Sequence, residues 1–436
     1  MTKRIAATVL AFLALCSCQL AFSTVGSWTK VKGPPKPITS SAWVPLADGR
    51  IALFGGYLPG GQPTNETNLY DPATGSWTSG APMPGPGLAD VFAQLRDGTV
   101  LVEGGRDVNG VLSGAAWLYD PARNTWSQTG SVIDPRSGPS VALLTDGRLL
   151  IAGGSVLLAQ PESTVNGEVD FTPIASAEIY DPATKRWSQA GHLSAARNGV
   201  TLVATGGGGA VAAGGCQGSA GWSPPVATAE TYDPATNAWS KTTALPVAIC
   251  GAVGTTLRDG RALIVDSYSF PGVERYFYTS TNDAFVYDPK TRQWTLSAGL
   301  ASGGMDTLLL NDGRVLVPEV QQGAIQGRLF KEFVGGQVFD PSTNQWTYAS
   351  TTAVTMPVAY MFTGQPPIAI ALANGTAVVI LQTDAVAYDP ELPPPSSQLL
   401  DSAGLTFVLG AGLVVILLLM LLAYRRAVRT DPAKLA

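Results

Sequence analysis

The stretch that decides the fold reads Tyr-Asp-Pro-Ala-Thr-Gly-Ser-Trp at residues 70–77. Related stretches recur 49 to 61 residues apart, and their first residues are Tyr119, Tyr180, Tyr232, Tyr287, Phe339 and Tyr388. Self-similarity at a period of about 40–50 residues is typical of radial arrays of small sheets. The sequence therefore predicts seven repeated units arranged around an axis.

A second repeated stretch precedes the first one in each unit and begins with a tight turn. In the first unit it is Asp48-Gly49-Arg50, followed by an apolar run and then by Gly55-Gly56. Asp-Gly between two apolar runs is a strong hairpin signal, because Gly adopts a positive φ at little cost. The apolar run is typical of a strand buried on both faces. The turn recurs at Asp97, Asp146, Gly207, Asp259, Asp312 and Asn374.

The Asp-Pro step of the first stretch predicts a second turn. Asp accepts hydrogen bonds from the backbone N–H groups ahead of it, and Pro fixes φ. The closing Trp is expected to anchor one sheet against the next. Four of the six complete copies place a residue that tolerates left-handed φ late in this turn, namely Gly75, Asn124, Asn237 and Asn344.

The tryptophans predict how the array closes. The seventh copy, which starts at Tyr388, lacks a Trp, whereas Trp28 stands near the N-terminus without a unit of its own. An unpaired sheet edge is a liability, and propellers leave only short, protected edges. We therefore expect Trp28 to lie on a strand that completes the last sheet. The predicted fold is an all-β, seven-bladed β-propeller closed by an N-terminal strand, with one C-terminal transmembrane helix.

The repeated units resemble the kelch family. The matching residues are Gly55-Gly56, Tyr70 and Trp77, together with Glu178 and Glu230 two positions before their tyrosines. The resemblance covers roughly residues 26–390, and it departs from the family pattern in the last three units, where other residues replace the glycine pair. It implies four-stranded blades. It also implies ligand sites on the face formed by the loops between strands 2 and 3 and between strands 4 and 1.

Within that family the chain is similar to bacterial-type, galactose-oxidase-like propellers, but it lacks their copper ligands. Those propellers bind copper through histidines and tyrosines, and His192 is the single histidine here. Arg136 and Arg197 keep an Arg that many bacterial kelch repeats carry before the turn, but Pro139 and Val200 stand near where a His is expected. A Ser/His/Asp triad would also need that one histidine. We therefore expect no catalytic residue, no metal and no cofactor.

An apolar segment precedes the repeats. Residues 1–23 contain Lys3-Arg4, then an apolar stretch, then small residues, which is the pattern of a secretory signal peptide. Lipidation at Cys18 and an uncleaved anchor are the alternatives to ordinary cleavage. The sequence thus predicts export of the repeats.

A second apolar segment follows the repeats. Residues 403–424 carry no charge and are long enough to span a bilayer. Basic residues follow in 425–436, which places this tail in the cytoplasm. The chain is therefore expected to be a single-pass protein of the cell membrane with its propeller on the extracytoplasmic side. The predicted segments are the signal peptide 1–23, the propeller 24–390, a Pro-rich stalk 391–402, the transmembrane helix 403–424 and the basic tail 425–436.

Two cysteines remain after the leader, Cys216 and Cys250. The repeat frame places both on the same face of adjacent blades. Outside the cytoplasm this arrangement favours a disulfide over two free thiols.

Aromatic and arginine residues gather in the expected strand 2–3 loops of the fourth to sixth units. Aromatics with Arg on exposed loops are typical of binding surfaces, although loop aromatics also pack as local cores. The candidate ligand-binding residues are Trp222, Tyr268, Phe270, Arg275, Tyr276, Tyr278 and Arg328.

The charge of the chain excludes one class of partner. Only 14% of residues are charged and the net charge is −5, so no basic footprint for nucleic acid is present. The leading hypothesis is a membrane-anchored extracellular module that binds a protein or a glycan and is not an enzyme. The alternatives are a carbohydrate-active enzyme using acidic residues of the loop face and a purely structural surface protein.

Overall fold

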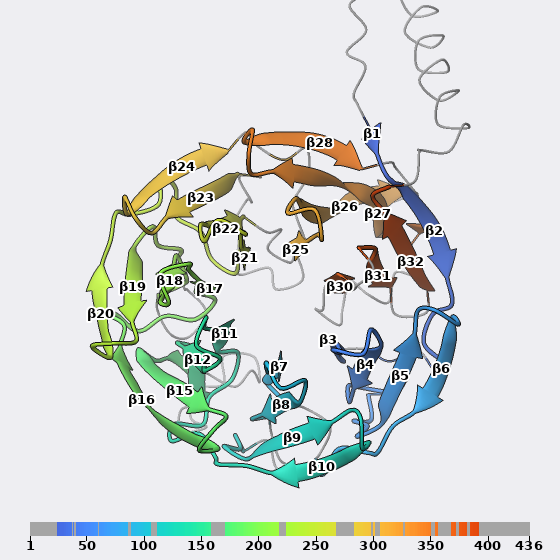
Figure 1. The fold of residues 1–436 in the computed structure, drawn as a ribbon, viewed down its shortest axis with the longest axis horizontal. Coiled ribbons are helices and arrows are strands. Elements are labelled where there is room, and N and C mark those ends of the chain that lie inside the picture. Colours follow the sequence, from blue (N-terminus) through green and yellow to red (C-terminus); the bar gives the residue numbers. More distant parts are fainter. Residues whose placement is uncertain are drawn as a thin grey trace, which may run out of the picture.

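Each repeated unit folds into an antiparallel sheet, and seven such sheets surround a common axis (Figure 1). The fold is therefore an all-β, seven-bladed β-propeller, as the repeat predicts. The computed structural model describes residues 24–36, 38, 41–59, 61–85, 89–105, 111–157, 171–217, 224–266, 283–297, 300, 306–325, 328–349, 354–355, 368–371, 375–381 and 384–391.

The first four blades have four strands each, which follow one another outward from the axis (Figure 1). Blade 1 contains β3 (Ala42–Pro45), β4 (Ile51–Phe54), β5 (Thr67–Asp71) and β6 (Ser76–Ser79), and blade 2 contains β7 (Val91–Gln94), β8 (Val100–Glu103), β9 (Ala116–Asp120) and β10 (Thr125–Gln128). Blade 3 contains β11 (Ser140–Leu143), β12 (Leu149–Ala152), β15 (Ser176–Asp181) and β16 (Arg186–His192), with the separate hairpin β13 (Ser155–Leu157) and β14 (Phe171–Pro173). Blade 4 contains β17 (Thr201–Ala204), β18 (Ala210–Ala213), β19 (Ala229–Asp233) and β20 (Ala238–Lys241).

The remaining blades follow the same plan with additions at the seam of the ring. Blade 5 contains β21 (Val253–Thr256), β22 (Ala262–Val265), β23 (Ala284–Asp288) and β24 (Gln293–Ser297). Blade 6 contains β25 (Leu308–Leu309), β26 (Val315–Ile325), β27 (Arg328–Asp340), β28 (Gln345–Ala349) and the short β29 (Val354–Thr355). Blade 7 contains β30 (Ile368–Ala371), β31 (Ala377–Leu381), β32 (Asp384–Asp389) and the N-terminal β2 (Ser27–Val31).

The N-terminal segment closes the ring. Strand β2 pairs antiparallel with β32, and Trp28 lies opposite Tyr388, as the tryptophans predict. The preceding strand β1 (Thr24–Val25) pairs in parallel with β28 of blade 6. The segment therefore joins blade 6 to blade 7, and this second attachment was not expected from the repeat.

The second strand of each of the first five blades is completely buried, because its two faces contact neighbouring blades. One apolar layer, for example, brings Leu101 of blade 2 against Leu149 and Ile151 of blade 3. The core thus consists of layers between blades, which confirms the expectation from the apolar runs.

In several blades the indole N–H of the closing Trp donates a hydrogen bond to the last strand of the preceding blade or to the chain that follows it. The Trp126 Nε1 donates a hydrogen bond to the Ala81 carbonyl at 2.9 Å, and the Trp77 Nε1 donates to the Lys32 carbonyl at 3.2 Å. Since Lys32 follows β2, the second bond lies at the seam between blades 7 and 1. The tryptophans therefore anchor blade to blade, as predicted.

The strand 3–4 turns adopt the left-handed conformation that their sequence predicts. Gly75 has a φ of 63° and Asn124 a φ of 53°. Lys185 and Arg292 occupy the same position with φ of 56° and 58°, although neither residue type favours it. Repeated packing around the turn thus fixes this conformation even where the residue is unfavourable.

The predicted anchors lie outside the described residues. These are the signal peptide 1–23, the span 403–424 and the tail 425–436, together with the stalk after Glu391. Within the part of the chain that the structure describes, no helix is long and apolar enough to cross a membrane.

Candidate functional site

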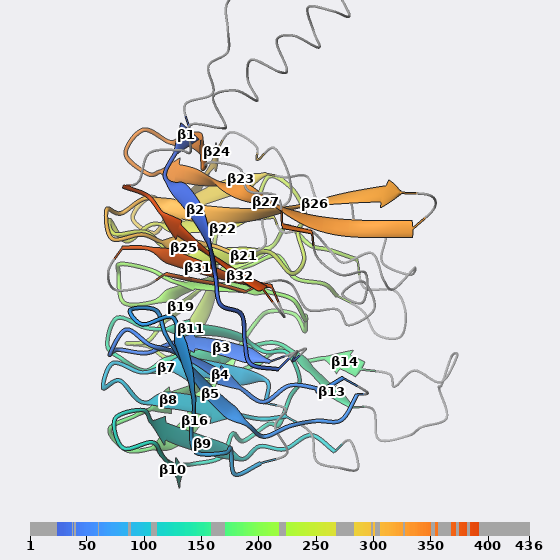
Figure 2. The same ribbon diagram turned by 90° about the vertical axis from the view of Figure 1, so that its right-hand side faces the viewer.

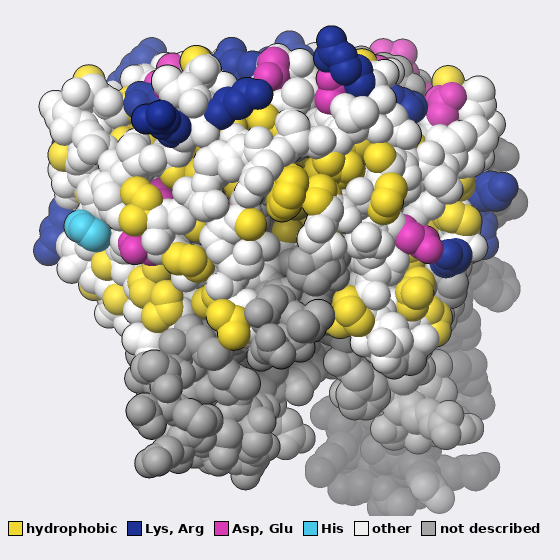
Figure 3. Space-filling view, turned by 90° about the horizontal axis from the view of Figure 1, so that it is seen from below, with side chains coloured by type: hydrophobic (Ala, Val, Ile, Leu, Met, Phe, Trp, Pro, Cys, Tyr) yellow, Lys and Arg dark blue, Asp and Glu magenta, His cyan; other side chains and the backbone are white. Residues whose placement is uncertain are grey.

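The two faces of the ring differ in what they carry. The turn face holds the strand 1–2 turns, such as residues 46–50, and the strand 3–4 turns, such as residues 71–76. The loop face holds the strand 2–3 and strand 4–1 connections, such as residues 111–115 and 129–139. Figure 3 shows Lys, Arg, Asp and Glu side chains gathered along the turn face, at the top of the view, whereas the wall below is mainly hydrophobic and uncharged.

Several charged side chains of the turn face form ion pairs with one another. The Asp48 carboxylate accepts a hydrogen bond from the Arg50 guanidinium at 2.6 Å, and the same guanidinium donates to the Pro121 carbonyl of blade 2 at 3.0 Å. Such bonds fasten each turn and join neighbouring blades. The same ion pair forms between Asp146 and Arg148, Asp259 and Arg261, and Asp312 and Arg314.

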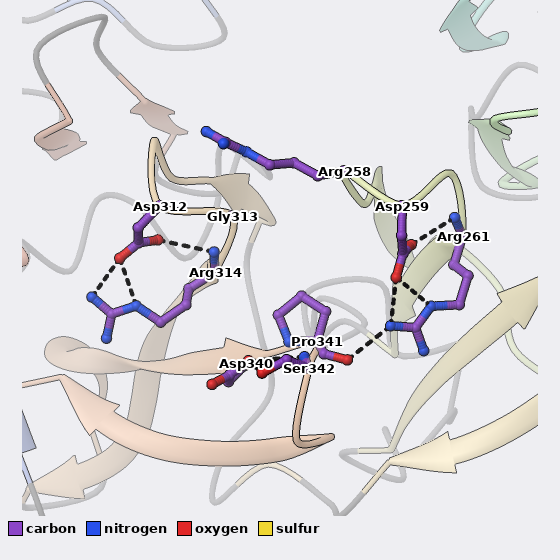
Figure 4. A pocket seen from close by; sticks show the side chains of 9 residues that line it. All are labelled: Arg258, Asp259, Arg261, Asp312, Gly313, Arg314, Asp340, Pro341 and Ser342. Carbon is purple, nitrogen blue, oxygen red and sulfur yellow. Dashed lines mark hydrogen bonds and ion pairs between the residues drawn. The ribbon is translucent and has the colours of Figure 1, made fainter.

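A cavity of about 680 Å³ opens on the turn face between blades 5 and 6 (Figure 4). Its charged lining residues are Arg258, Arg261, Arg314, Asp259, Asp312 and Asp340. The Arg261 guanidinium bonds both Asp259 and the Pro341 carbonyl, the latter at 2.8 Å. The charges of the lining side chains balance, and their bonds fasten the turns and join blade 5 to blade 6.

The loop face contains a buried ion pair in blade 3. The Arg136 guanidinium bonds the Glu178 carboxylate at 2.6 Å, and both side chains are fully buried. Arg136 also donates to the Ser176 carbonyl at 2.6 Å, and the other Glu178 oxygen accepts from the Ile133 N–H at 2.7 Å. The pair thereby fixes the chain that enters blade 3 onto the strands of that blade.

Blade 4 repeats this arrangement. The Arg197 guanidinium bonds the Glu230 carboxylate, and it also donates to the Thr228 hydroxyl at 2.7 Å. Glu230 accepts a further bond from the Ser194 N–H at 2.9 Å. A buried pair with these partners holds a connection in place, and removing one member leaves an uncompensated charge. Both pairs are therefore structural.

A third acidic residue, Glu103, is buried near the first of these pairs. It ends β8, opposite Val91, where the other blades have Phe54, Ala152, Ala213 and Val265. Glu103 is fully buried, and neither of its carboxylate oxygens makes a hydrogen bond in the described structure. This is a carboxyl group in a position that the fold otherwise fills with apolar side chains.

Asp90, which immediately precedes the adjacent strand β7, is a neighbour of Glu103. The backbone N–H of Asp90 donates to the Glu103 carbonyl at 3.0 Å. The Asp90 carboxylate accepts bonds from the Gly105 N–H at 2.9 Å and from the Ser137 hydroxyl and Gly138 N–H at 3.0 Å. Asp90 thus ties blade 2 to the chain that enters blade 3.

The pKa of Glu103 is raised to about 8, chiefly by burial. The Asp90 and Glu178 carboxylates also act to raise this pKa, and the Arg136 guanidinium acts to lower it. Glu103 is therefore protonated at neutral pH, because its charged form would be desolvated beside two carboxylates.

An apolar slot of about 150 Å³ lies on the loop face between blades 1 and 2. Met83, Ala89, Trp117 and Trp126 supply much of its lining. Ile133, in the neighbouring connection, is 51% exposed. The slot is small, so it could hold one apolar side chain rather than a whole ligand.

Two hairpins extend beyond the sheets on this face. β13–β14 rises from blade 3, and the longer β26–β27 hairpin rises from blade 6 (Figure 2). The turn face has only short turns by comparison (Figure 2). The loop face therefore has an uneven surface with projecting hairpins, which suits recognition of a partner.

The predicted ligand-binding residues fall mostly outside the described residues. Arg328 is described and begins β27, at the tip of the projecting hairpin. Their expected clustering into one pocket stays a prediction. Those outside the described residues are Trp222, Tyr268, Phe270, Arg275, Tyr276 and Tyr278.

Cys216 and Cys250 are joined by a disulfide, with Cα atoms 5.4 Å apart. Cys216 follows β18 of blade 4, and Cys250 precedes β21 of blade 5, so the bond links adjacent blades at the loop face. The Cys216 N–H also donates to the Asn198 carbonyl at 2.8 Å. The Gly215 N–H donates to the Ile249 carbonyl at 2.9 Å, so backbone hydrogen bonding also joins the two segments that the disulfide links.

Replacing both cysteines with Ala should lower the free energy of unfolding by about 2–4 kcal/mol, because the cross-link restricts the unfolded chain. Urea denaturation of the two proteins measures this difference. A non-reduced digest of the wild-type protein should contain the two peptides as one cross-linked species. Free, alkylated thiols at both positions would contradict the bond.

Metal ligands do not gather in the described part of the chain, where no three His, Cys, Asp or Glu side chains are placed to hold an ion. His192 ends β16 and is exposed. Sequence reasoning did not single out Glu103 or Asp90. The one available signal was a carboxylate immediately before the glycine pair Gly104-Gly105, in a run that is otherwise apolar.

Comparison with known proteins supports the fold. No family model and no curated protein matches the chain. A solved structure described as "Structure of YjhT" is similar, with a TM-score of 0.50 and 17% identity, over 73% of this chain and 99% of that one. At this identity the likeness shows the fold alone, and the resemblance to kelch repeats stays a prediction.

Proposed function

We propose that this chain is a kelch-like binding protein whose loop face recognises a protein or a glycan outside the cell. The observation that carries the proposal is the difference between the faces. The turn face is fastened by repeated Asp–Arg pairs such as Asp48–Arg50, whereas the loop face bears the projecting hairpins (Figure 2). Binding residues commonly lie on loops positioned by a rigid scaffold. The uneven relief also favours recognition over a purely structural role.

The ends of the described propeller support a membrane anchor. Ser27 pairs with Asp389, so the chain enters and leaves the ring at the same seam. Segments before residue 24 and after residue 391 therefore start close together. We propose that residues 1–23 direct export and that residues 403–424 hold the propeller on the extracytoplasmic side. Protease added to intact cells should cleave the propeller, whereas protection until lysis would contradict this placement.

The acidic residues of the loop face favour binding over catalysis. Glu178 and Glu230 are engaged in structural ion pairs. The neighbouring pair Asp90 and Glu103 is the one observation that favours a carbohydrate-active enzyme, because such enzymes combine a protonated acid with a carboxylate. Glu103, however, is fully buried, so a substrate does not reach it in this conformation.

A binding screen tests the proposed function. We expect the full chain to give a saturable hit on a glycan array or against cell-surface proteins. Replacing Arg328, Trp222 or Tyr276 with Ala should weaken that hit at least about tenfold, as hot-spot residues do. Arg123→Ala is the matched control, because Arg123 is an exposed arginine of the turn face. If Arg123→Ala weakens the hit and the loop variants leave it unchanged, recognition lies on the turn face, and the proposal is contradicted.

A further inference from the structure

The threonine that begins β5 carries a hydroxyl group that the fold does not use. Thr67 is 2% exposed, and its Oγ1 makes no hydrogen bond in the part of the chain that the structure describes. A Cβ on Gly80 would lie 2.7 Å from the Thr67 Cγ2, so the methyl group of Thr67 fills the space beside this glycine. A valine would fill the same space without burying a hydroxyl group.

The equivalent positions of the other blades carry no hydroxyl group. They lie three residues before the repeated Tyr or Phe and are occupied by Ala116, Ala177, Ala229, Ala284, Gly336 and Ala385. A buried hydroxyl without a partner loses its hydrogen bonds to water and so destabilises the folded state. The packing of the blades therefore does not account for a threonine at position 67.

Thr67 completes the sequence Asn65-Glu66-Thr67, which is the pattern of an asparagine that accepts an N-linked glycan. The pattern requires Ser or Thr two positions after the asparagine, and the feature that these two residues share is the hydroxyl group. The group that the fold does not use is thus the group that the pattern requires.

The acceptor side chain is accessible on the loop face. Asn65 is exposed and lies in blade 1, where the strand 2–3 connection enters β5. Its Nδ2 donates a hydrogen bond to the Met83 carbonyl at 3.0 Å. An amide nitrogen carries two protons, and a glycan replaces one of them, so this bond can persist in the modified protein.

We propose that Asn65 is a site of N-linked glycosylation. The inference rests on the proposed export of the chain, because this modification marks surface loops of secreted proteins. The donor is a lipid-linked oligosaccharide diphosphate. A bond forms between the Asn65 Nδ2 and the anomeric carbon of the first sugar. The bond from that carbon to the diphosphate oxygen breaks, the lipid diphosphate leaves with its electron pair, and one Nδ2 proton passes to solvent.

The burial of Thr67 sets the order of events. In the folded propeller its hydroxyl is inaccessible, so the transfer precedes the folding of blade 1. After folding, the glycan stands on blade 1, whereas the projecting hairpins belong to blades 3 and 6 (Figure 1).

Mass spectrometry of peptides from the full chain, isolated from its own cells, tests the proposal. We expect a glycan on Asn65, and we expect its complete loss in Asn65→Gln and in Thr67→Val. Thr67→Ser should keep the glycan, because serine also supplies the hydroxyl. Thr78→Val is the matched control, because Thr78 is an exposed threonine of the next strand. Residues 374–376 carry the same pattern, so the modified peptide is identified by its sequence.

Urea denaturation separates the modification from a structural role of the same threonine. Thr67→Val and Asn65→Gln both lack the glycan, and Thr67→Val should be at least as stable because it removes a buried, unpaired hydroxyl. Lower stability of Thr67→Val would contradict the proposal, since the fold would then use this hydroxyl.

An unmodified Asn65 in the wild-type protein would overturn the proposal. Protease treatment of intact cells then shows how far the failure extends. If the protease cleaves the propeller, glycosylation fails while the proposed placement outside the cell stands. If the propeller is protected until lysis, both fail.

Discussion

Replacing Trp28 with Ala should lower the free energy of unfolding by about 3–5 kcal/mol. Trp28 is only 7% exposed, and its ring centroid lies 4.9 Å from that of Tyr388. It belongs to an apolar layer that also contains Leu316 and Val338 of blade 6. The substitution therefore empties a space between two blades and weakens the strand that closes the ring.

Urea denaturation of the full chain, followed by tryptophan fluorescence and circular dichroism, measures this effect. Thr29→Ala is the matched control, because Thr29 is exposed on the same strand and should change stability little. Trp28→Phe should recover part of the loss, since it keeps a buried aromatic ring. Equal stability of the wild-type and Trp28→Ala proteins would refute the role of this residue in closure.

Trp28 also shows why so much of the ring could be predicted from the sequence. Most blades repeat the same short-range signals, namely an Asp-Gly turn, an apolar run, an Asp-Pro turn and a Trp. Counting tryptophans against units then locates the seam. The pairing of Thr24 and Val25 with β28 has no such signal, because two residues outside the repeat carry no periodicity.

The polar interior of the loop face could be predicted only in part. The sequence drew attention to both Arg136 and Glu178. Arg136 precedes the turn of the third unit, and Glu178 lies two positions before Tyr180. Their ion pair joins residues 42 positions apart, so it depends on how the connection folds back onto the blade. Glu103 was harder to find, because its strand is correctly predicted as buried and a single carboxylate does not disturb that pattern.

The candidate ligand-binding residues illustrate a different limit. Arg328 was expected in a loop, whereas it begins a strand of thirteen residues. The hairpin extends a normal blade strand past the ring, and the pairing continues through Pro318 and Gly335-Gly336, residues that would be expected to end the strands there. Long-range pairing with β26, rather than local propensity, sets its length.

Glu103 should make the propeller less stable as the pH rises from about 4.5 to about 8. Burial raises its pKa to about 8, from 4.5 for a free carboxyl. Between these values the unfolded chain releases the proton while the folded chain keeps it, so each pH unit costs the folded state about 1.4 kcal/mol. The contribution of protonated Glu103 to the free energy of unfolding is complete below pH 4.5 and is lost by about pH 8. Across this window the loss amounts to about 4–5 kcal/mol.

Comparison with Glu103→Leu and Glu103→Gln isolates this contribution, because all other titrating groups are shared. Leu restores the apolar character that Phe54 and Val265 give this position in blades 1 and 5. The stability advantage of both variants over wild type should therefore grow with pH, and it should level off above pH 8. An advantage that does not change between pH 5 and 8 would show that Glu103 is ionised in the folded protein, and thus that a compensating partner reaches it. That result would turn attention to the Asp90–Glu103 pair as a chemical site, since a solvated or paired Glu103 could contact a substrate.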